Sequence, residues 1–149
     1  MGEVVPGQVA IIAPPAITRG LIITGHQGVQ RADGSAPSGV IQAFDAQSGK
    51  LRWAWDLGAP ELATRPAQGK TYTPGTPRLL TTATSDEQLG QVYLPLGDAV
   101  AAAGGGRMAT SLVALGGTTG KPAWTLQAGP GDAWNDDLVA QASLVDFPT

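Results

Sequence analysis

The sequence contains no cysteine, and this absence excludes disulfide bridges and thiolate metal sites. Charged residues are also scarce, at 14% of the 149 residues, against about 25% in typical soluble domains. The nine Lys and Arg residues are scattered, so we expect no nucleic-acid partner and no attraction to an anionic membrane surface. No apolar run approaches the roughly 18 residues of a membrane span, and the chain does not begin with the basic start of a signal peptide.

Glycine and proline, by contrast, are abundant, with 21 and 12 residues. Windows without either residue that are long enough for a helix are therefore few, and the composition favours short strands joined by turns. Apolar residues make up 42% of the chain, which is more than a disordered segment contains. The composition predicts an all-β fold with a packed core.

An internal repeat is the most informative feature of the chain. The segment Ala43–Trp53 recurs 71 residues later as Ala114–Trp124, with Ala, Gly, Lys and Trp at matching positions. The strand-like segments upstream of each copy also match, and Pro14–Ile17 at the start of the first unit resembles Thr76–Leu79. The starts of successive units lie about 62 to 66 residues apart. Gly49 and Gly120 hold the turn of each copy, where a backbone with positive φ is needed.

Each unit reads as four short strands, and a four-stranded antiparallel unit repeated in tandem is typical of a β-propeller blade. We expect blade-like units at about 14–73 and 74–139, and the start of a further unit at 140–149. Two units do not close a ring, so the chain is interpreted as an incomplete propeller, produced by gene decay or by truncation. We expect Trp53, Trp55 and Trp124 to pack between blades.

The repeated pattern resembles the tryptophan-docking motif of quinoprotein alcohol and sugar dehydrogenases. Longer strings narrow the resemblance to the membrane-bound glucose dehydrogenases that depend on pyrroloquinoline quinone (PQQ). These strings are Pro37–Ile41, Phe44–Ala46, Gly49–Leu51, Trp53–Asp56, Thr71–Thr73, Gly75–Pro77, Gln91–Gly97, Asp132–Trp134 and Ala140–Thr149. The match runs collinearly from about Pro14 to Thr149 and covers a central fraction of a full-length member.

The resemblance implies an eight-bladed propeller with PQQ on its axis, a divalent cation (Ca or Mg) beside the cofactor, and an active site on the periplasmic side of the inner membrane. It implies oxidation of glucose or another aldose at C1, with ubiquinone as the electron acceptor. An Asp general base removes the sugar hydroxyl proton while hydride moves to the quinone. By this resemblance, Asp132 is the catalytic base, and Gly97, Asp98 and Trp134 contact the cofactor.

The chain departs from the family pattern at several of these positions. The motif around Asp132 lacks two histidines and a second aspartate. In the family pattern Thr-Pro-Asn-x-Trp, Arg78 stands at the asparagine, and Leu80 stands where an aromatic floor for the quinone is expected. Gln30 and Arg31 align with the cation-binding pair, where Arg31 would repel a divalent ion, so we expect no metal site in this chain. We therefore expect no saturable binding of PQQ by the isolated chain.

Other signals favour ordinary roles. Asp132, Asp136 and Asp137 lack EF-hand spacing and are interpreted as a solvated acidic loop rather than a cation site. The single histidine, His26, is expected at the surface, and Gly104–Gly106 lacks the Lys of a phosphate loop.

Three functions remain open. The first is an inactive fragment of a PQQ-dependent glucose dehydrogenase. The second is a non-catalytic binding module that associates with itself through open blade edges, and the third is a decayed gene product. Two isolated blades leave apolar faces in water, so we expect self-association or marginal stability.

Overall fold

The computed structural model describes residues 9–25, 27–28, 39–57, 72–73, 77–99, 108, 110–128 and 137–147. These residues form strands and turns and contain no helix, which confirms the predicted all-β class. No helix in the described ranges is long and apolar enough to cross a membrane.

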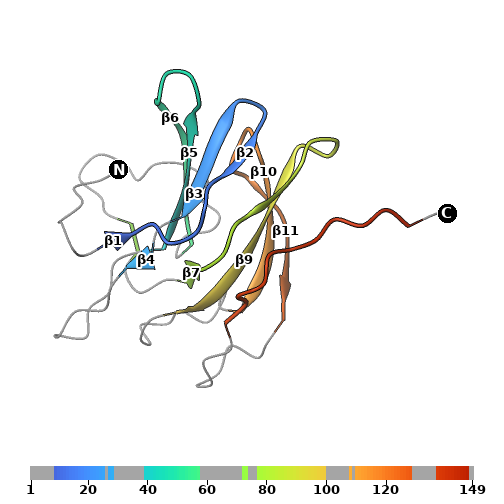
Figure 1. The fold of residues 1–149 in the computed structure, drawn as a ribbon. Helices are drawn as coiled ribbons and strands as arrows, with labels where there is room; N and C mark the ends of the chain where they lie inside the picture. The colour runs from blue at the N-terminus through green and yellow to red at the C-terminus, as the bar shows by residue number, and fades with distance from the viewer. Residues whose placement is uncertain are drawn as a thin grey trace.

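The first blade is a four-stranded antiparallel sheet in the order β2-β3-β5-β6 (Figure 1). Its strands are β2 (Ala16–Thr18), β3 (Leu21–Gly25), β5 (Val40–Asp45) and β6 (Leu51–Asp56). The second blade has the order β11-β10-β9-β7, with β8 also paired to β9. Its strands are β7 (Pro77–Leu79), β8 (Thr84–Asp86), β9 (Gln91–Ala99), β10 (Ser111–Gly116) and β11 (Pro122–Gln127). A two-stranded ribbon pairs β1 (Val9–Ala10) with β4 (Gln27–Gly28).

The last two strands of each blade form the predicted hairpins. β5 pairs with β6 and β10 pairs with β11, and both pairs carry a register shift directly after the repeated alanine, Ala43 or Ala114. Gly49 and Gly120 both adopt φ of +68°, as the turn between these strands requires. The repeat in the sequence is therefore a repeat in backbone geometry.

The first strand of the second blade differs from the sequence expectation. Thr76–Leu79 was matched to the segment that starts the first unit, yet the counterpart of β2 is β8. Thr18 pairs with Leu21 in the first blade as Asp86 pairs with Gln91 in the second. The reason is the length of β9, whose nine residues pair with β8 near one end and with β7 near the other, so this sheet has five strands.

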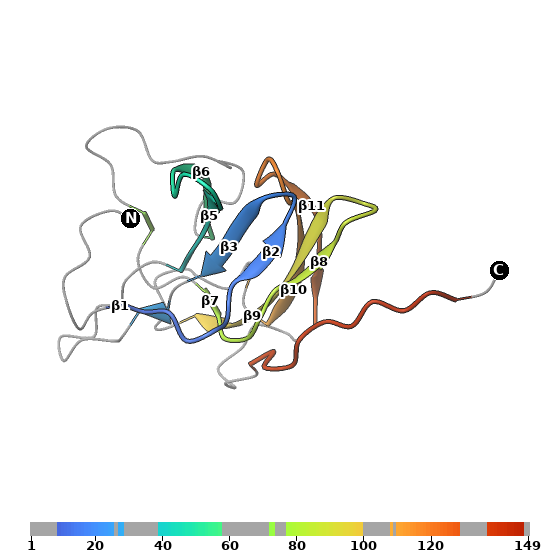
Figure 2. The same cartoon turned by 45° about the horizontal axis from the view of Figure 1, so that its top comes forward.

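The two sheets lie side by side, and the hydrophobic core lies between them (Figure 2). A row of directly paired residues crosses the first blade toward the second: Ala16, Ile23, Ala43 and Trp53, all buried. The second blade meets this row with the buried side chains of Val92, Leu94, Leu96, Val113 and Leu115. Apolar burial of this kind is the main stabilising contribution to the fold.

A tryptophan joins the two blades at their outer strands. Trp53 is only 5% exposed, and its indole Nε1 donates a 3.0 Å hydrogen bond to the carbonyl oxygen of Gly117 in the turn between β10 and β11. A Cβ atom added to Gly120 would lie 2.5 Å from Cε3 of Trp53, so the ring lies flat against this turn. The prediction that Trp53 packs between blades is confirmed.

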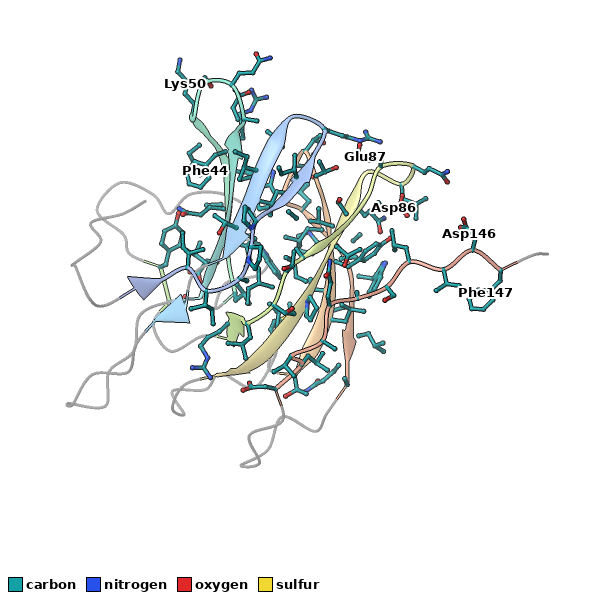
Figure 3. The ribbon with its side chains drawn as sticks, viewed as in Figure 1. Phe44, Lys50, Asp86, Glu87, Asp146 and Phe147 are labelled. Carbon is teal, nitrogen blue, oxygen red and sulfur yellow. The ribbon has the colours of Figure 1, made fainter. Side chains whose placement is uncertain are left out.

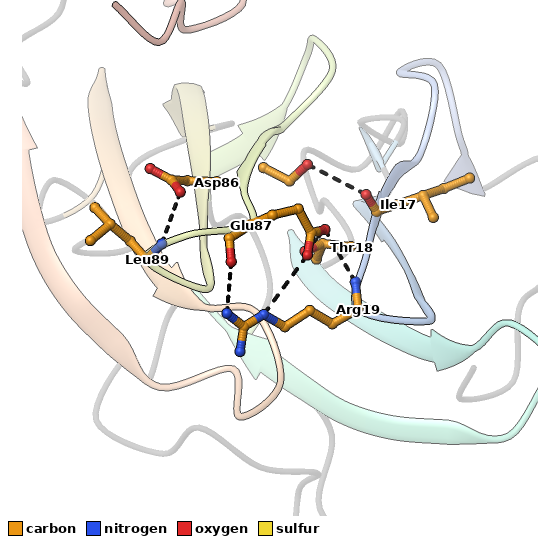
Figure 4. Close-up of polar contacts among 7 residues, drawn as sticks. Ile17, Thr18, Arg19, Asp86, Glu87 and Leu89 are labelled. Carbon is orange, nitrogen blue, oxygen red and sulfur yellow. Dashed lines mark hydrogen bonds and ion pairs between the residues drawn. The ribbon is translucent and has the colours of Figure 1, made fainter. Parts of the chain in front are cut away.

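Hydrogen bonds and an ion pair join the turn between β2 and β3 of the first blade to the turn between β8 and β9 of the second (Figure 4). The Thr18 hydroxyl donates a 2.6 Å hydrogen bond to Oε1 of Glu87, and the Arg19 backbone N–H donates to the same oxygen at 3.2 Å. Nη2 of Arg19 donates to the Glu87 carbonyl oxygen at 2.7 Å, and an ion pair of 3.9 Å joins the two side chains. The two blades are thus joined at two places: where β6 meets the turn between β10 and β11, and where the turn between β2 and β3 meets the turn between β8 and β9.

Each blade also ties its own two turns together. The backbone N–H of Ala46 donates to the Gly20 carbonyl at 2.9 Å, and that of Gly117 donates to the Gly90 carbonyl at 2.8 Å. In the first blade the turn between β5 and β6 is therefore held to the turn between β2 and β3. In the second blade the turn between β10 and β11 is held in the same way to the turn between β8 and β9.

Candidate functional site

The predicted cofactor contact Gly97 lies in β9, where three segments that are distant in sequence meet. A Cβ atom added to Gly97 would lie 2.5 Å from Oδ1 of Asp137 and 2.6 Å from Cδ1 of Leu80. The Thr110 N–H also donates to the Gly97 carbonyl oxygen, at 3.4 Å. Only glycine can occupy this position without displacing Leu80 or Asp137.

Leu80 directly follows β7 and is half-buried against Gly97. By the family resemblance, an aromatic floor for the quinone is expected at this position. The structure therefore brings a predicted departure, Leu80, into contact with a predicted cofactor residue, Gly97.

Asp137 is the residue at this place to which the sequence assigned no role in the site. It was interpreted as part of a solvated acidic loop, yet it is half-buried with a carboxylate oxygen over Gly97. No signal in its local sequence distinguishes it from Asp136, since both follow the same glycine-rich loop. Within the described residues, no three His, Asp or Glu side chains gather as a metal site would require.

Arg78 lies one residue before the buried Leu79, and its buried Nε atom has no hydrogen-bond partner among the residues that the structure describes. Buried donors are normally paired, and an unpaired donor costs about 1–3 kcal/mol. The resemblance expects a smaller, neutral asparagine here, so the arginine is a second departure beside Leu80.

The remaining predicted site residues lie outside the described part of the chain. These are Asp132 and Trp134, and also the side chain of Asp98, whose backbone belongs to β9. Gln30, Arg31 and His26 lie outside it as well. Their assigned roles stay predictions.

The described residues at Gly97 do not fit the quinone cofactor. On the side of Gly97 where a Cβ atom would point, a cofactor would have to lie where Leu80 and the Asp137 carboxylate already lie. A carboxylate there would also repel an anionic ligand, and Leu80 offers no flat aromatic face. We therefore assign no chemical step to the cofactor in this chain.

Comparison with known proteins places the chain among the quinoproteins. It is 36% identical over 155 residues to the glycerol dehydrogenase large subunit of Gluconobacter thailandicus, covering 99% of this chain and 21% of that protein. It is also 36% identical over 154 residues to the quinoprotein glucose dehydrogenase of Escherichia coli K12, covering 99% of this chain and 19% of that protein. The chain thus spans about a fifth of the length of these curated relatives.

Solved structures agree on the fold. The quinohemoprotein alcohol dehydrogenase from Comamonas testosteroni matches with a TM-score of 0.67 at 24% identity, over 91% of this chain and 23% of that chain. A europium-containing methanol dehydrogenase matches with a TM-score of 0.61 at 18% identity, over 87% and 26% of the two chains. The family model for the β-propeller domain of PQQ-type glucose/ethanol/alcohol dehydrogenases matches residues 1–149. The chain therefore belongs to the β-propeller family of the PQQ-dependent dehydrogenases.

Proposed function

We propose that the chain forms two blades of a PQQ-dependent dehydrogenase that oxidises glucose or another aldose at C1 and passes the electrons to ubiquinone. The proposed place of this reaction is the periplasmic side of the inner membrane. The observation that carries the proposal is the family match over residues 1–149, together with intact packing between the two blades through Trp53. We further propose that the isolated chain is inactive.

The contrast between packing and site residues supports the proposed inactivity. Among the described residues, a buried hydrogen bond from Trp53 to Gly117 holds one blade to the next. At Gly97, however, Leu80 and Asp137 fill the space above the glycine, and Nε of Arg78 has no hydrogen-bond partner in the described part of the chain. Oxidation of a sugar needs its groups held to about half an ångström, and most of the ring that would enclose them lies beyond two blades.

The choice of an aldose rests on the sequence resemblance. The glycerol dehydrogenase large subunit matches at the same 36% identity as the glucose dehydrogenase, so glycerol is the competing substrate. In either case the proposed role of Asp132 is to take the proton of the substrate hydroxyl.

Dye reduction by the purified chain tests the inactivity. Glucose, glycerol or quinate is supplied with PQQ and either calcium or magnesium, and we expect no reduction above the substrate-free rate. Reduction that requires both glucose and PQQ, and that Asp132→Asn abolishes, would show that the isolated chain is an enzyme.

A chimera tests the substrate class. The chain replaces the matching segment of the E. coli glucose dehydrogenase, with and without changes that restore the family pattern at Arg78, at Leu80, at the Gln30–Arg31 pair and in the motif around Asp132. Folding is checked by solubility and by β-sheet circular dichroism. We expect glucose oxidation only from the restored chimera, and its loss on Asp132→Asn. If only the equivalent chimera in the glycerol dehydrogenase large subunit is active, and on glycerol, the proposal of an aldose is wrong.

A further inference from the structure

The last strand of the second blade leaves its large apolar side chains in water. Trp124 occupies the position of Trp53 in the repeat, yet it is 43% exposed where Trp53 is 5% exposed. Leu126 occupies the position of Trp55 and is 59% exposed, whereas Trp55 is fully buried. All six residues of β11 are exposed, while four of the six in β6 are buried.

Trp124 has the same place in the strand pairing of the second blade as its counterpart Trp53 has in the first. It pairs with Ala114, which pairs with Tyr93, and this row repeats the row Trp53, Ala43 and Ile23 of the first blade. The Tyr93 ring lies 5.7 Å from the Trp124 ring, between centroids, at an interplanar angle of 32°. Such a contact fixes the indole on its strand without burying its outer side.

The surface that would receive this tryptophan is present at the other end of the same chain. The turn Ala46–Gly49 repeats the turn Gly117–Gly120. The Gly49 N–H donates to the Asp45 carbonyl oxygen and the Gly120 N–H donates to the Gly116 carbonyl oxygen, at 2.8 Å in both. Gly120 is covered by Trp53, whereas a Cβ atom on Gly49 would meet no atom of the described residues within 4 Å. The turn Ala46–Gly49 thus has the same geometry as the turn Gly117–Gly120, and no described side chain covers it.

We propose that a second copy of this chain docks on the exposed face of β11, head to tail, with the Ala46–Gly49 turn of the second copy against Trp124 and Leu126. The contact copies the one that the two blades already make within the chain. It does not depend on the redox function proposed above. In this arrangement Nε1 of Trp124 donates to the Ala46 carbonyl of the second copy, as Nε1 of Trp53 donates to Gly117.

The C-terminal segment 137–147 lies at the inner end of the same face. The Thr84 hydroxyl donates to the Ala142 carbonyl at 2.5 Å, much as the Ser85 hydroxyl donates to Ile17 of the first blade at 3.4 Å. Asp146 and Phe147, farther along the segment, project away from the sheets (Figure 3). A docked copy places its own β2 along β8, so residues near Ala142 must give way, and this limits the affinity.

The contact uses a different surface on each partner, so it is heterologous, and each copy offers one tryptophan face and one turn. This asymmetry provides a test that a general loss of folding cannot imitate. Leu126→Glu damages only the face, and Ala46→Glu damages only the turn. Both positions are exposed, so neither change should alter the melting temperature of the monomer beyond the small effect of surface substitutions.

Sedimentation velocity on the full chain, between about 1 and 200 µM, measures the association. We expect the unchanged chain to associate with rising concentration, and each variant alone to associate at least about tenfold more weakly, because a carboxylate enters an apolar contact. An equimolar mixture of the two variants should form a dimer and nothing larger, since one intact face meets one intact turn.

Three results would overturn the proposal. The first is an unchanged chain that stays monomeric over this range, and the second is either variant associating as tightly as the unchanged chain. The third is a mixture of the two variants that forms no dimer. Thr84→Val, which removes the hydrogen bond to Ala142, should tighten the association, and weaker association would contradict the displacement of that segment.

Discussion

The indole N–H of Trp53 donates a buried 3.0 Å hydrogen bond to the carbonyl oxygen of Gly117, which lies 64 residues later and in the next blade. This bond places the last strand of one sheet against the last turn of the other. We predict that Trp53→Phe lowers the free energy of unfolding by about 1–3 kcal/mol, because the Gly117 carbonyl loses its buried donor. Urea denaturation followed by circular dichroism measures the change.

Trp124→Phe is the matched control for that prediction. The same substitution at the equivalent position of the second blade removes a half-exposed indole, so we expect a change within about 0.5 kcal/mol. Equal losses at the two positions would show that the hydrogen bond to Gly117 does not stabilise the pair of blades.

Gly120→Ala and Gly49→Ala separate backbone strain from steric contact. Both glycines have φ of +68°, so each alanine costs about 1–2 kcal/mol of left-handed strain. Only the Gly120 methyl group meets the Trp53 ring, 2.5 Å away, which adds about 1–3 kcal/mol of overpacking. Thermal and urea unfolding should therefore give a lower free energy of unfolding for Gly120→Ala than for Gly49→Ala. The reverse order would contradict the contact with Trp53.

The Asp45 carboxylate makes the first blade sensitive to acid. The Ser48 hydroxyl and the Ser48 and Gln47 backbone N–H groups donate to Oδ1, and these bonds hold the pKa of Asp45 below its ordinary value of 3.8. A lowered pKa in the folded state means that this stabilisation is complete above 3.8 and is lost as the pH falls through the folded-state pKa.

Asp45→Asn should consequently flatten the dependence of stability on pH below about pH 4, because one group that gains protons on unfolding is gone. The second blade has Gly116 at the matching position, so its turn contributes no such term. Urea midpoints between about pH 5 and pH 2.5 make the comparison. If Asp45→Asn lost as much stability at low pH as the unchanged chain, the assignment of this effect to Asp45 would be wrong.

Glu87→Ala tests the polar contacts between the β2–β3 turn and the β8–β9 turn. We expect a loss of about 1 kcal/mol, which comes from the hydrogen bonds donated by Thr18 and Arg19 to the carboxylate rather than from the exposed ion pair. Salt screens an exposed ion pair but not a short hydrogen bond. The loss should thus be nearly equal in about 0.1 M and 1 M sodium chloride, and a loss confined to low salt would contradict this account.

The sequence predicted the parts of the fold that repeat. The eleven-residue match between Ala43–Trp53 and Ala114–Trp124 was enough to predict two hairpins, their glycine turns and the packing of Trp53. These features depend on local turn chemistry and on a strand period that two copies display twice. Such signals survive without any knowledge of the tertiary structure.

The first strand of the second blade and the candidate site were harder to predict from the sequence. β8 was not recognised as the counterpart of β2, because Thr84–Asp86 lacks the apolar pattern of Ala16–Thr18 and β9 extends past it to pair with β7. The contact of Asp137 with Gly97 joins residues 40 positions apart and follows from the path of the chain rather than from a motif. Long-range contacts of this kind leave no periodic trace in a single sequence.

The bonds from Ala46 to Gly20 and from Gly117 to Gly90 have a consequence for motion. Because each of them ties the two turns at one end of a blade, neither hairpin can fray there without breaking the link to the other. The amide protons of Ala46 and Gly117 should therefore exchange with solvent only when a blade opens as a unit. Their exchange rates would report how often whole blades part within the native state.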